Sequence, residues 1–199
     1  MTNIAIFVSG NGTNCENIIR YFQDNKDIKV RLVISNRTDA YALTRAAKYN
    51  VPCTVLSKNE INDITTIMPI LNDYAIDFIV LAGFMLMIPA FLTEKYNHRI
   101  VNIHPSLLPK YGGKGMYGHY VHEAVKAAGE KETGITIHFV STVCDGGEII
   151  AQFSTALSPD DTVEDIEAKV HILEQKHFPE IIENVISCNT NNPDTKNKK

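Results

Sequence analysis

The sequence predicts an α/β protein with three layers, in which helices lie on both faces of a mostly parallel sheet. Short apolar runs alternate with segments of helical periodicity through the first half of the chain, which is typical of parallel strands joined by helical crossovers. The run DFIVLAG at 77–83 is apolar almost throughout, as expected for a strand covered on both faces. Two further strand-like runs, at 133–140 and 148–153, follow each other closely. We therefore expect a Rossmann-like sheet with an antiparallel pair near the C-terminal end.

The expected strands are short apolar runs flanked by turn residues, and the expected helices carry apolar residues three and four positions apart. After the SGNGTN turn, for example, Ile18, Ile19 and Phe22 share one helix face. The other expected strands lie at 4–8, 29–34, 51–56 and 99–104, and the other helices at 40–49, 62–74, 89–96, 118–128 and 162–186.

Two prolines interrupt the helical segments. Proline lacks a backbone N–H, and its ring clashes with the preceding turn. Pro69 therefore predicts either a late helix start near Met68 or a kink in the 62–74 segment. For the same reason, we expect Pro179 to bend the helix over 162–186.

The domain organisation follows from the length of the chain. Its 199 residues suffice for one well-buried core, and no internal repeat or long linker divides them. We therefore expect a single domain over 1–187. The segment 188–199 is polar and has no apolar face, so we expect it to be a disordered tail.

Composition and charge exclude several classes of protein. The formal net charge of -4 gives no basic surface of the size that nucleic-acid binding usually requires. We see no signal peptide, and Gly83 and Pro89 break the most apolar stretch before it could span a membrane. The four cysteines are scattered without a C-x-x-C motif, so free thiols in a reducing cytoplasm are the simplest interpretation. We expect a cytoplasmic monomer or homodimer that binds small molecules.

The loop SGNGTN places Gly10 and Gly12 between the first strand and the following helix. Glycines let backbone amides approach an anion, and a helix N-terminus favours negative charge, so a phosphate is the expected ligand. Thr13 or Asn14 could cap the helix and add a donor. A dinucleotide fingerprint would have glycine where Cys15 stands and an acidic residue after the second strand, where SNR occurs. The loop thus favours a monophosphate over NAD, with a glycine turn that binds nothing as the alternative.

The segment RIVNIHP ends an apolar strand with an amide and an imidazole. Asn102 and His104 are two residues apart, so their side chains project from the same face, and Pro105 restrains His104 to an extended backbone. Ligands bind at strand ends in open α/β sheets. An amide N–H and a protonated imidazole can stabilise an oxyanion, and an imidazole can transfer protons.

Asp145 in the segment VCDGGEI could orient His104 and favour its charged form. It lies between the last two expected strands, and the two glycines after it allow a close approach of the backbone. The alternatives are a structural, hydrogen-bonded His104 and a simple hairpin turn at Asp145. The sequence does not separate these interpretations, because it does not show the distances between the side chains.

Other candidate residues have simpler interpretations. His119 and His122 have the spacing of a metal pair, but no convincing third ligand accompanies them, and we expect no metal. Cys144 could act as a nucleophile, but nothing in the sequence predicts a lowered pKa of its thiol. Glu174, next to Leu173, is either a carboxylate at the edge of the apolar face or a ligand for a substrate amine. Its helical position alone favours the former.

Several stretches together resemble the folate-dependent formyltransferases, in particular those of purine synthesis that act on phosphoribosylglycinamide. NIHPSLLP with the later DGG is specific to the wider formyltransferase superfamily. The phosphate loop and the length of the chain narrow the resemblance to the members that act on phosphoribosylglycinamide. It extends from residue 4 to about 186, in the order of the family, through the stretches IAIFVSGNGTN, FIVLAGFM, IVNIHPSLLPKY, ETGITIHFV, DGGEIIAQ and KVHILEQKHFP.

The resemblance implies an enzyme of de novo purine biosynthesis that uses 10-formyltetrahydrofolate as co-substrate and needs no metal. The formyl group would be transferred to the amine of phosphoribosylglycinamide. Asn102, His104 and Asp145 match the catalytic residues of the family. Asn102 and protonated His104 would stabilise a tetrahedral oxyanion, and Asp145 would keep His104 charged and organise a water for proton transfer.

The resemblance also implies two binding segments. Gly12, Thr13 and Asn14 would bind the substrate phosphate, and Glu174 would lie near the substrate amine. The folate would contact Asn102 and, largely through the backbone, the residues Met85, Leu86, Met87 and Ile88.

Three departures from the family pattern concern substrate contacts rather than the catalytic residues. Leu86 stands where many members carry arginine. The stretch LSKNEIND lacks an arginine that helps many relatives bind the phosphate, and Lys58 could replace it. The loop KYGGKGMYGHY, including residues 110–118, is longer than the common KYPG version.

Three alternatives remain at this point. An activity like that of methionyl-tRNA formyltransferase would use the same core, but that family carries an additional RNA-binding domain, and the net charge of -4 argues against it. A ligand-binding or regulatory domain without catalysis would not need Asn102, His104 and Asp145 together. An NAD-dependent oxidoreductase is disfavoured by Cys15 and by the SNR sequence after the second strand.

Overall fold

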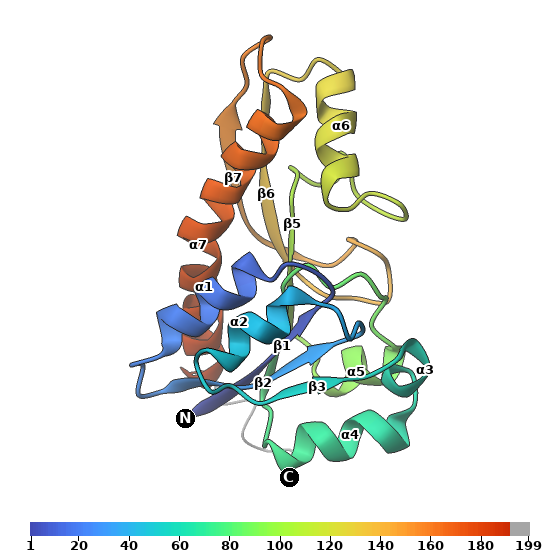
Figure 1. Ribbon diagram of the computed structural model, residues 1–199, viewed down its shortest axis with the longest axis vertical. Coiled ribbons are helices and arrows are strands. Elements are labelled where there is room, and N and C mark those ends of the chain that lie inside the picture. The colour runs from blue at the N-terminus through green and yellow to red at the C-terminus, as the bar shows by residue number, and fades with distance from the viewer. Residues whose placement is uncertain (192–199) are drawn as a thin grey trace.

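The computed structural model describes residues 1–191 as an α/β fold built on one twisted sheet (Figure 1). The sheet has seven strands in the order β3-β2-β1-β4-β5-β6-β7. β1 to β5 pair in parallel, whereas β6 pairs antiparallel with both β5 and β7. The expected fold class is confirmed. The strands are β1 (Thr2–Val8), β2 (Ile28–Ser35), β3 (Cys53–Val55), β4 (Phe78–Leu81), β5 (Ile100–His104), β6 (Glu132–Phe139) and β7 (Ile149–Ala156).

Helices cover both faces of the sheet because alternate strand residues point to opposite sides. In β1, Ile6 packs in a cluster with α1, α2 and α7, whereas Phe7 packs in a second cluster with α3, α4 and α5. Burial of each such side chain contributes about 1.5–3 kcal/mol. The helices are α1 (Thr13–Phe22), α2 (Tyr41–Ala47), α3 (Lys58–Ile61), α4 (Ile64–Asp73), α5 (Ala90–Lys95), α6 (His119–Ala127) and α7 (Val163–Asn191).

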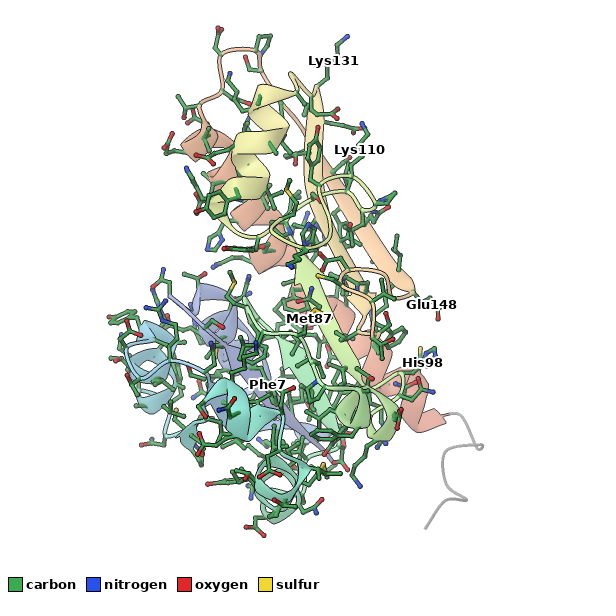
Figure 2. All side chains as sticks on the ribbon, turned by 90° about the vertical axis from the view of Figure 1, so that its right-hand side faces the viewer. Phe7, Met87, His98, Lys110, Lys131 and Glu148 are labelled. Carbon is green, nitrogen blue, oxygen red and sulfur yellow. The ribbon has the colours of Figure 1, made fainter. Side chains whose placement is uncertain are left out.

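The C-terminal part of the sheet extends beyond the parallel strands. Figure 1 shows β6, β7, α6 and the first half of α7 above the part that contains β1 to β4. Val121 and Val125 of α6 pack against Ile166 of α7 in a separate small cluster. Figure 2 shows Phe7 inside the lower part and Lys131 at the far end of the extension.

Several element boundaries differ from the expectation. The expected late helix start near Met68 is wrong, because α4 begins at Ile64 and Pro69 lies inside it. Asp63 caps this helix by accepting from the backbone N–H of Thr65. α3 was not predicted from the sequence, although Ser57 and Glu60 form its capping box, a recognisable start signal.

The C-terminal helix is longer than expected. Pro179 lies within α7, which is assigned as one helix from Val163 to Asn191 and thus enters the segment expected to be a tail. The rest of that segment, 192–199, lies outside the described residues. No helix among residues 1–191 combines the length and the apolar character needed to cross a membrane.

The strand order reverses direction beside β1. β2 and β3 lie on one side of β1, and β4 and β5 lie on the other. In open α/β sheets, the carboxyl ends of the strands form a ligand-binding crevice at such a reversal. A cavity of about 650 Å³ lies here, lined by the segments after β1, β4 and β5, by the β6–β7 loop and by α7.

Candidate active site

The glycine loop after β1 forms one wall of the cavity. Gly12 is the N-cap of α1 and has a φ of 76°, a backbone conformation that favours glycine. A Cβ at this position would also overlap the Cβ of Ala42. The expected capping of α1 by Thr13 or Asn14 is wrong, because no side chain caps this helix. Asn14 instead reaches across the cavity wall to α7.

Glu174 of α7 is the partner of Asn14. Its Oε2 accepts hydrogen bonds from Nδ2 of Asn14 at 2.9 Å and from Nδ1 of His171 at 3.0 Å. The hydrogen bond to Glu174 raises the pKa of His171. The interpretation of Glu174 as an edge carboxylate is therefore wrong, since it is a buried residue that lines the cavity. Oδ1 of Asn14 is also buried and has no hydrogen-bond partner within the described residues.

β5 places Asn102 and His104 at the floor of the cavity. His104 is only 4% exposed, and its Nε2–H donates to the backbone carbonyl of Tyr111 at 2.7 Å. Asp145 approaches from the β6–β7 loop, with its Oδ2 at 3.6 Å from Nδ1 of His104. The backbone N–H of Gly113 donates to the same oxygen at 2.9 Å. The three residues expected to act together thus meet at one place.

The ionisation of this group differs in part from the expectation. Burial lowers the pKa of His104, and the opposing influence of Asp145 does not compensate for it. Burial alone would raise the pKa of Asp145, but His138, Gly113 and His104 more than offset this, so the pKa of Asp145 is lowered. Asp145 is therefore a carboxylate at neutral pH, whereas the unbound site favours neutral His104 over the expected cation.

His138 is a further residue of the site that was not predicted from the sequence. It lies on β6 opposite Asn102, with its Nε2 at 3.1 Å from Nδ2 of Asn102 and 3.7 Å from Oδ1 of Asp145. The alternation in ITIHF offered a signal, because it places Thr136 and His138 on one face of a strand. Its importance appears only once β6 is known to pair with β5.

The segment after β4 forms the opposite side of the cavity, which Leu86 and Ile88 also line. The backbone N–H of Met85 donates to Oγ of Ser9 at 2.9 Å, which ties this segment to β1. Met85 and Met87 are 47% and 50% exposed, and Figure 2 labels Met87 where the two parts of the molecule meet. Exposed methionines beside a cavity are adaptable apolar contacts for a flat ligand.

The structure does not support a binding or catalytic role for several other candidate residues. Lys58 is not among the residues that line the cavity, whereas Lys114 of the long loop is. Burial raises the pKa of the Cys144 thiol, and Asp145 raises it further, which opposes a nucleophilic role. His119 lies near Glu123 and Glu167 at the surface. Within residues 1–191, no group of three or more His, Cys, Asp or Glu side chains could hold a metal ion.

Comparison with known proteins agrees with this geometry. The formyl transferase family matches residues 2–182. Phosphoribosylglycinamide formyltransferase of Haemophilus influenzae is 37% identical over 188 residues, which cover 92% of this chain and 86% of that protein. The enzyme of the same name from Bacillus subtilis is 34% identical, and the match covers 95% and 97% of the two chains.

Solved structures match over a similar length. The crystal structure of phosphoribosylglycinamide formyltransferase from Anaplasma phagocytophilum has a TM-score of 0.84 at 30% identity and covers 94% of this chain and 87% of its own. That from Bacillus halodurans has a TM-score of 0.84 at 33% identity and covers 94% and 96%. The chain therefore belongs to the formyl transferase family and, within it, to the phosphoribosylglycinamide formyltransferases.

Proposed function

We propose that the protein transfers the formyl group of 10-formyltetrahydrofolate to the amine of phosphoribosylglycinamide, in de novo purine biosynthesis. Membership of the family supports the reaction. The observation that carries the assignment of roles is the meeting of Asn102, His104 and Asp145 in a cavity that also contains a glycine loop and a helix N-terminus. An oxyanion site beside an anion site suits a phosphorylated acceptor of a formyl group.

The substrate phosphate is assigned to the loop formed by Gly12, Thr13 and Asn14. The N-terminus of α1 favours an anion there through its free N–H groups and its dipole. His171 supports this assignment, since its raised pKa favours a positive charge at the same wall of the cavity. It is the cation that we propose in place of the absent arginine.

The substrate amine is assigned to Glu174. Both hydrogen bonds that this carboxylate accepts from residues 1–191 use Oε2, so Oε1 is the oxygen that we assign to the amine. The folate is assigned to the segment Met85, Leu86, Met87 and Ile88 and to Asn102. Apolar side chains and backbone amides in that segment suit a flat heterocycle with hydrogen-bonding edges.

The chemistry proceeds through a tetrahedral intermediate. The amine nitrogen attacks the formyl carbon, and the electron pair of the C=O bond moves onto oxygen. Asn102 and His104 donate to this oxyanion, and the formyl oxygen replaces the Tyr111 carbonyl as the acceptor of the Nε2–H of His104. The attacking nitrogen passes a proton through a water to His104, which becomes positively charged, and the folate nitrogen takes a proton back by the same route as its bond to carbon breaks. Asp145 balances the positive charge on His104 and organises a water for proton transfer.

We assign the protein to the cytoplasm as a monomer or homodimer, without a metal or a nucleic-acid partner. The assignment of the compartment rests on the four free cysteines, which suit a reducing environment. The tRNA formyltransferase alternative and the non-catalytic alternative are kept as outcomes of the activity assay.

The test is an assay with phosphoribosylglycinamide and 10-formyltetrahydrofolate that follows the deformylated folate by absorbance. Activity should be lost in His104→Ala and survive in Cys144→Ala. Loss of activity in Cys144→Ala, together with activity that survives in His104→Ala, would assign the reaction to Cys144 instead of His104. Formylation of methionyl-tRNA but not of phosphoribosylglycinamide would establish the first alternative, and binding of both substrates without turnover would establish the second.

A further inference from the structure

Asn102 and His138 face each other across neighbouring antiparallel strands. Asn102 is the register partner of His138 in the β5–β6 ladder. On its other side, β6 has an irregularity between Ile137 and His138 in its pairing with β7, and such bulges re-aim side chains near active sites. The imidazole is 2% exposed and lines the cavity together with Asn102.

Contacts at both ring nitrogens define the tautomer of His138. Nδ1 lies 2.8 Å from the backbone carbonyl oxygen of Phe139. A carbonyl can only accept, so Nδ1 carries the proton. In the neutral ring, Nε2 then has a lone pair, and it lies 3.1 Å from Nδ2 of Asn102. Asn102 therefore donates one of its two amide N–H groups to His138.

This hydrogen bond determines which end of the carboxamide faces His138. If Asn102 were turned end for end, its Oδ1 would face the lone pair of Nε2, and neither atom could donate. The observed orientation leaves the second N–H of Asn102 for a ligand in the cavity. We propose that neutral His138 is a positioning residue, which holds Asn102 with this N–H available to the oxyanion. The inference rests on the role of Asn102 in the proposed function.

Protonation of His138 would remove this restraint. A cationic imidazole carries N–H groups on both nitrogens and can accept from neither. Nε2–H would then seek an acceptor, either Oδ1 of a reversed Asn102 or the carboxylate of Asp145, whose Oδ1 lies 3.7 Å away. In both cases the N–H of Asn102 loses its acceptor. We therefore expect protonation of His138 to lower kcat.

Other titratable groups share this environment. His104 of β5 and Asp145 of the β6–β7 loop lie close to His138. His122 of α6 and Glu174 of α7 line the same cavity. A decrease of kcat at low pH, the acid limb of the rate profile, is therefore assigned to His138 only if the acid limb changes when His138 is replaced by a residue that does not titrate.

A matched pair of variants separates the two nitrogens of the ring. In His138→Gln, the side-chain oxygen can take the position of Nε2 and still accept from Asn102. In His138→Asn, the shorter amide can reach the carbonyl of Phe139, but no atom replaces Nε2. We expect His138→Asn to lower kcat by about 10²-fold, the usual effect of losing one oxyanion donor, with little change in either KM. His138→Gln should keep a larger part of kcat and lose the acid limb.

Several results would overturn the inference. Equal losses of kcat in the two variants would show that the acceptor at Nε2 is irrelevant, and an acid limb that persists in His138→Gln would remove the link to protonation. NMR of the isotope-labelled wild-type protein gives a readout that needs no variant: a proton on Nε2 of His138 at the pH of full activity would contradict the proposed tautomer.

The variant Asn102→Ala distinguishes this inference from the proposed function. Full kcat in Asn102→Ala would refute the role of Asn102 as an oxyanion donor, and with it the proposed mechanism. Loss of kcat in Asn102→Ala but not in His138→Asn would leave the proposed mechanism in place and refute only the positioning role.

Discussion

Nδ1 of His104 and Oδ2 of Asp145 lie 3.6 Å apart, although one residue ends β5 and the other belongs to the β6–β7 loop. The separation slightly exceeds a hydrogen bond. The carboxylate is held by the backbone N–H of Gly113, so it stays near the imidazole without depending on it. This arrangement keeps a negative charge available to His104 at the moment when the ring becomes protonated.

The role of the negative charge on Asp145 can be tested by a substitution that keeps the shape of the side chain. Asp145 has a φ of 51°, which asparagine tolerates better than most residues, so Asp145→Asn should fold. Because it removes the charge that favours the His104 cation, we expect kcat to fall by about 10²–10⁴-fold. The exposed Asp160→Asn is the matched control. Retention of more than a tenth of wild-type kcat in Asp145→Asn would contradict the role given to its charge.

The charge of Glu174 is expected to serve substrate binding. Glu174→Gln can still accept from Asn14, but it no longer offers a charge to the substrate amine or to His171. Charge-assisted hydrogen bonds contribute about 1.5–3 kcal/mol, so KM for phosphoribosylglycinamide should rise by about tenfold or more, while KM for the folate changes little. Glu180→Gln, on an exposed position of the same helix, is the control. Equal increases in both KM values would argue against contact with the amine.

His171 is expected to bind the phosphate as a cation. Because its raised pKa depends first on Glu174, the phosphate should bind more weakly in His171→Ala, and KM for phosphoribosylglycinamide should rise most at low pH, where the wild-type imidazole is charged. Inhibition by inorganic phosphate, measured across pH, provides a second readout. A pH dependence of that inhibition identical in wild type and variant would refute the assignment.

Gly12 combines a left-handed backbone with a close contact. In Gly12→Ala, the new Cβ would overlap Ala42 and would also make the φ of 76° unfavourable. Backbone strain of about 1–2 kcal/mol and overpacking of about 1–3 kcal/mol should both reduce the free energy of unfolding, measured in denaturant. Gly10→Ala is the control, because a Cβ there meets no atom within 4 Å. Similar stabilities of the two variants would contradict this account.

Buried histidines should make the fold sensitive to acid. Burial lowers the pKa of His104 and of His122 below the ordinary histidine value of about 6.5. A lowered folded-state pKa means that the unfolded chain takes up protons first, so stability is present above about pH 6.5 and is lost as pH falls through the folded-state pKa values. The pKa of His171 is raised, so its opposite contribution is lost as pH rises.

Equilibrium unfolding at a series of pH values tests this dependence. The slope below pH 6.5 should be reduced in His122→Gln, whose side chain has no charge to bury, and unchanged in the exposed His98→Gln. An identical slope in His122→Gln and wild type would show that His122 does not contribute.

The sequence predicted features that depend on local pattern, and it failed where contacts between distant segments decide the outcome. The apolar composition of the run that contains Ile6 and Phe7 was enough to predict β1. Ser57 begins α3, a helix that was not expected, and Asp63 caps α4, whose expected late start near Met68 was wrong. The burial of Glu174 was not predictable from the spacing along α7, because its partner Asn14 lies at the other end of the chain. Likewise, His138 gains its meaning only from the register of β5 against β6.

The hydrogen bond between Asn14 and Glu174 joins residues that are 160 positions apart. During synthesis on the ribosome, α1 emerges before α7, so the nascent chain carries its glycine loop without the carboxylate until α7 has been made. α7 also contributes to the hydrophobic cluster that contains Ile6 of β1, so this cluster is incomplete until α7 is added. Activity and the completed hydrophobic core should therefore appear together, and a chain that stops before residue 163 should gain neither.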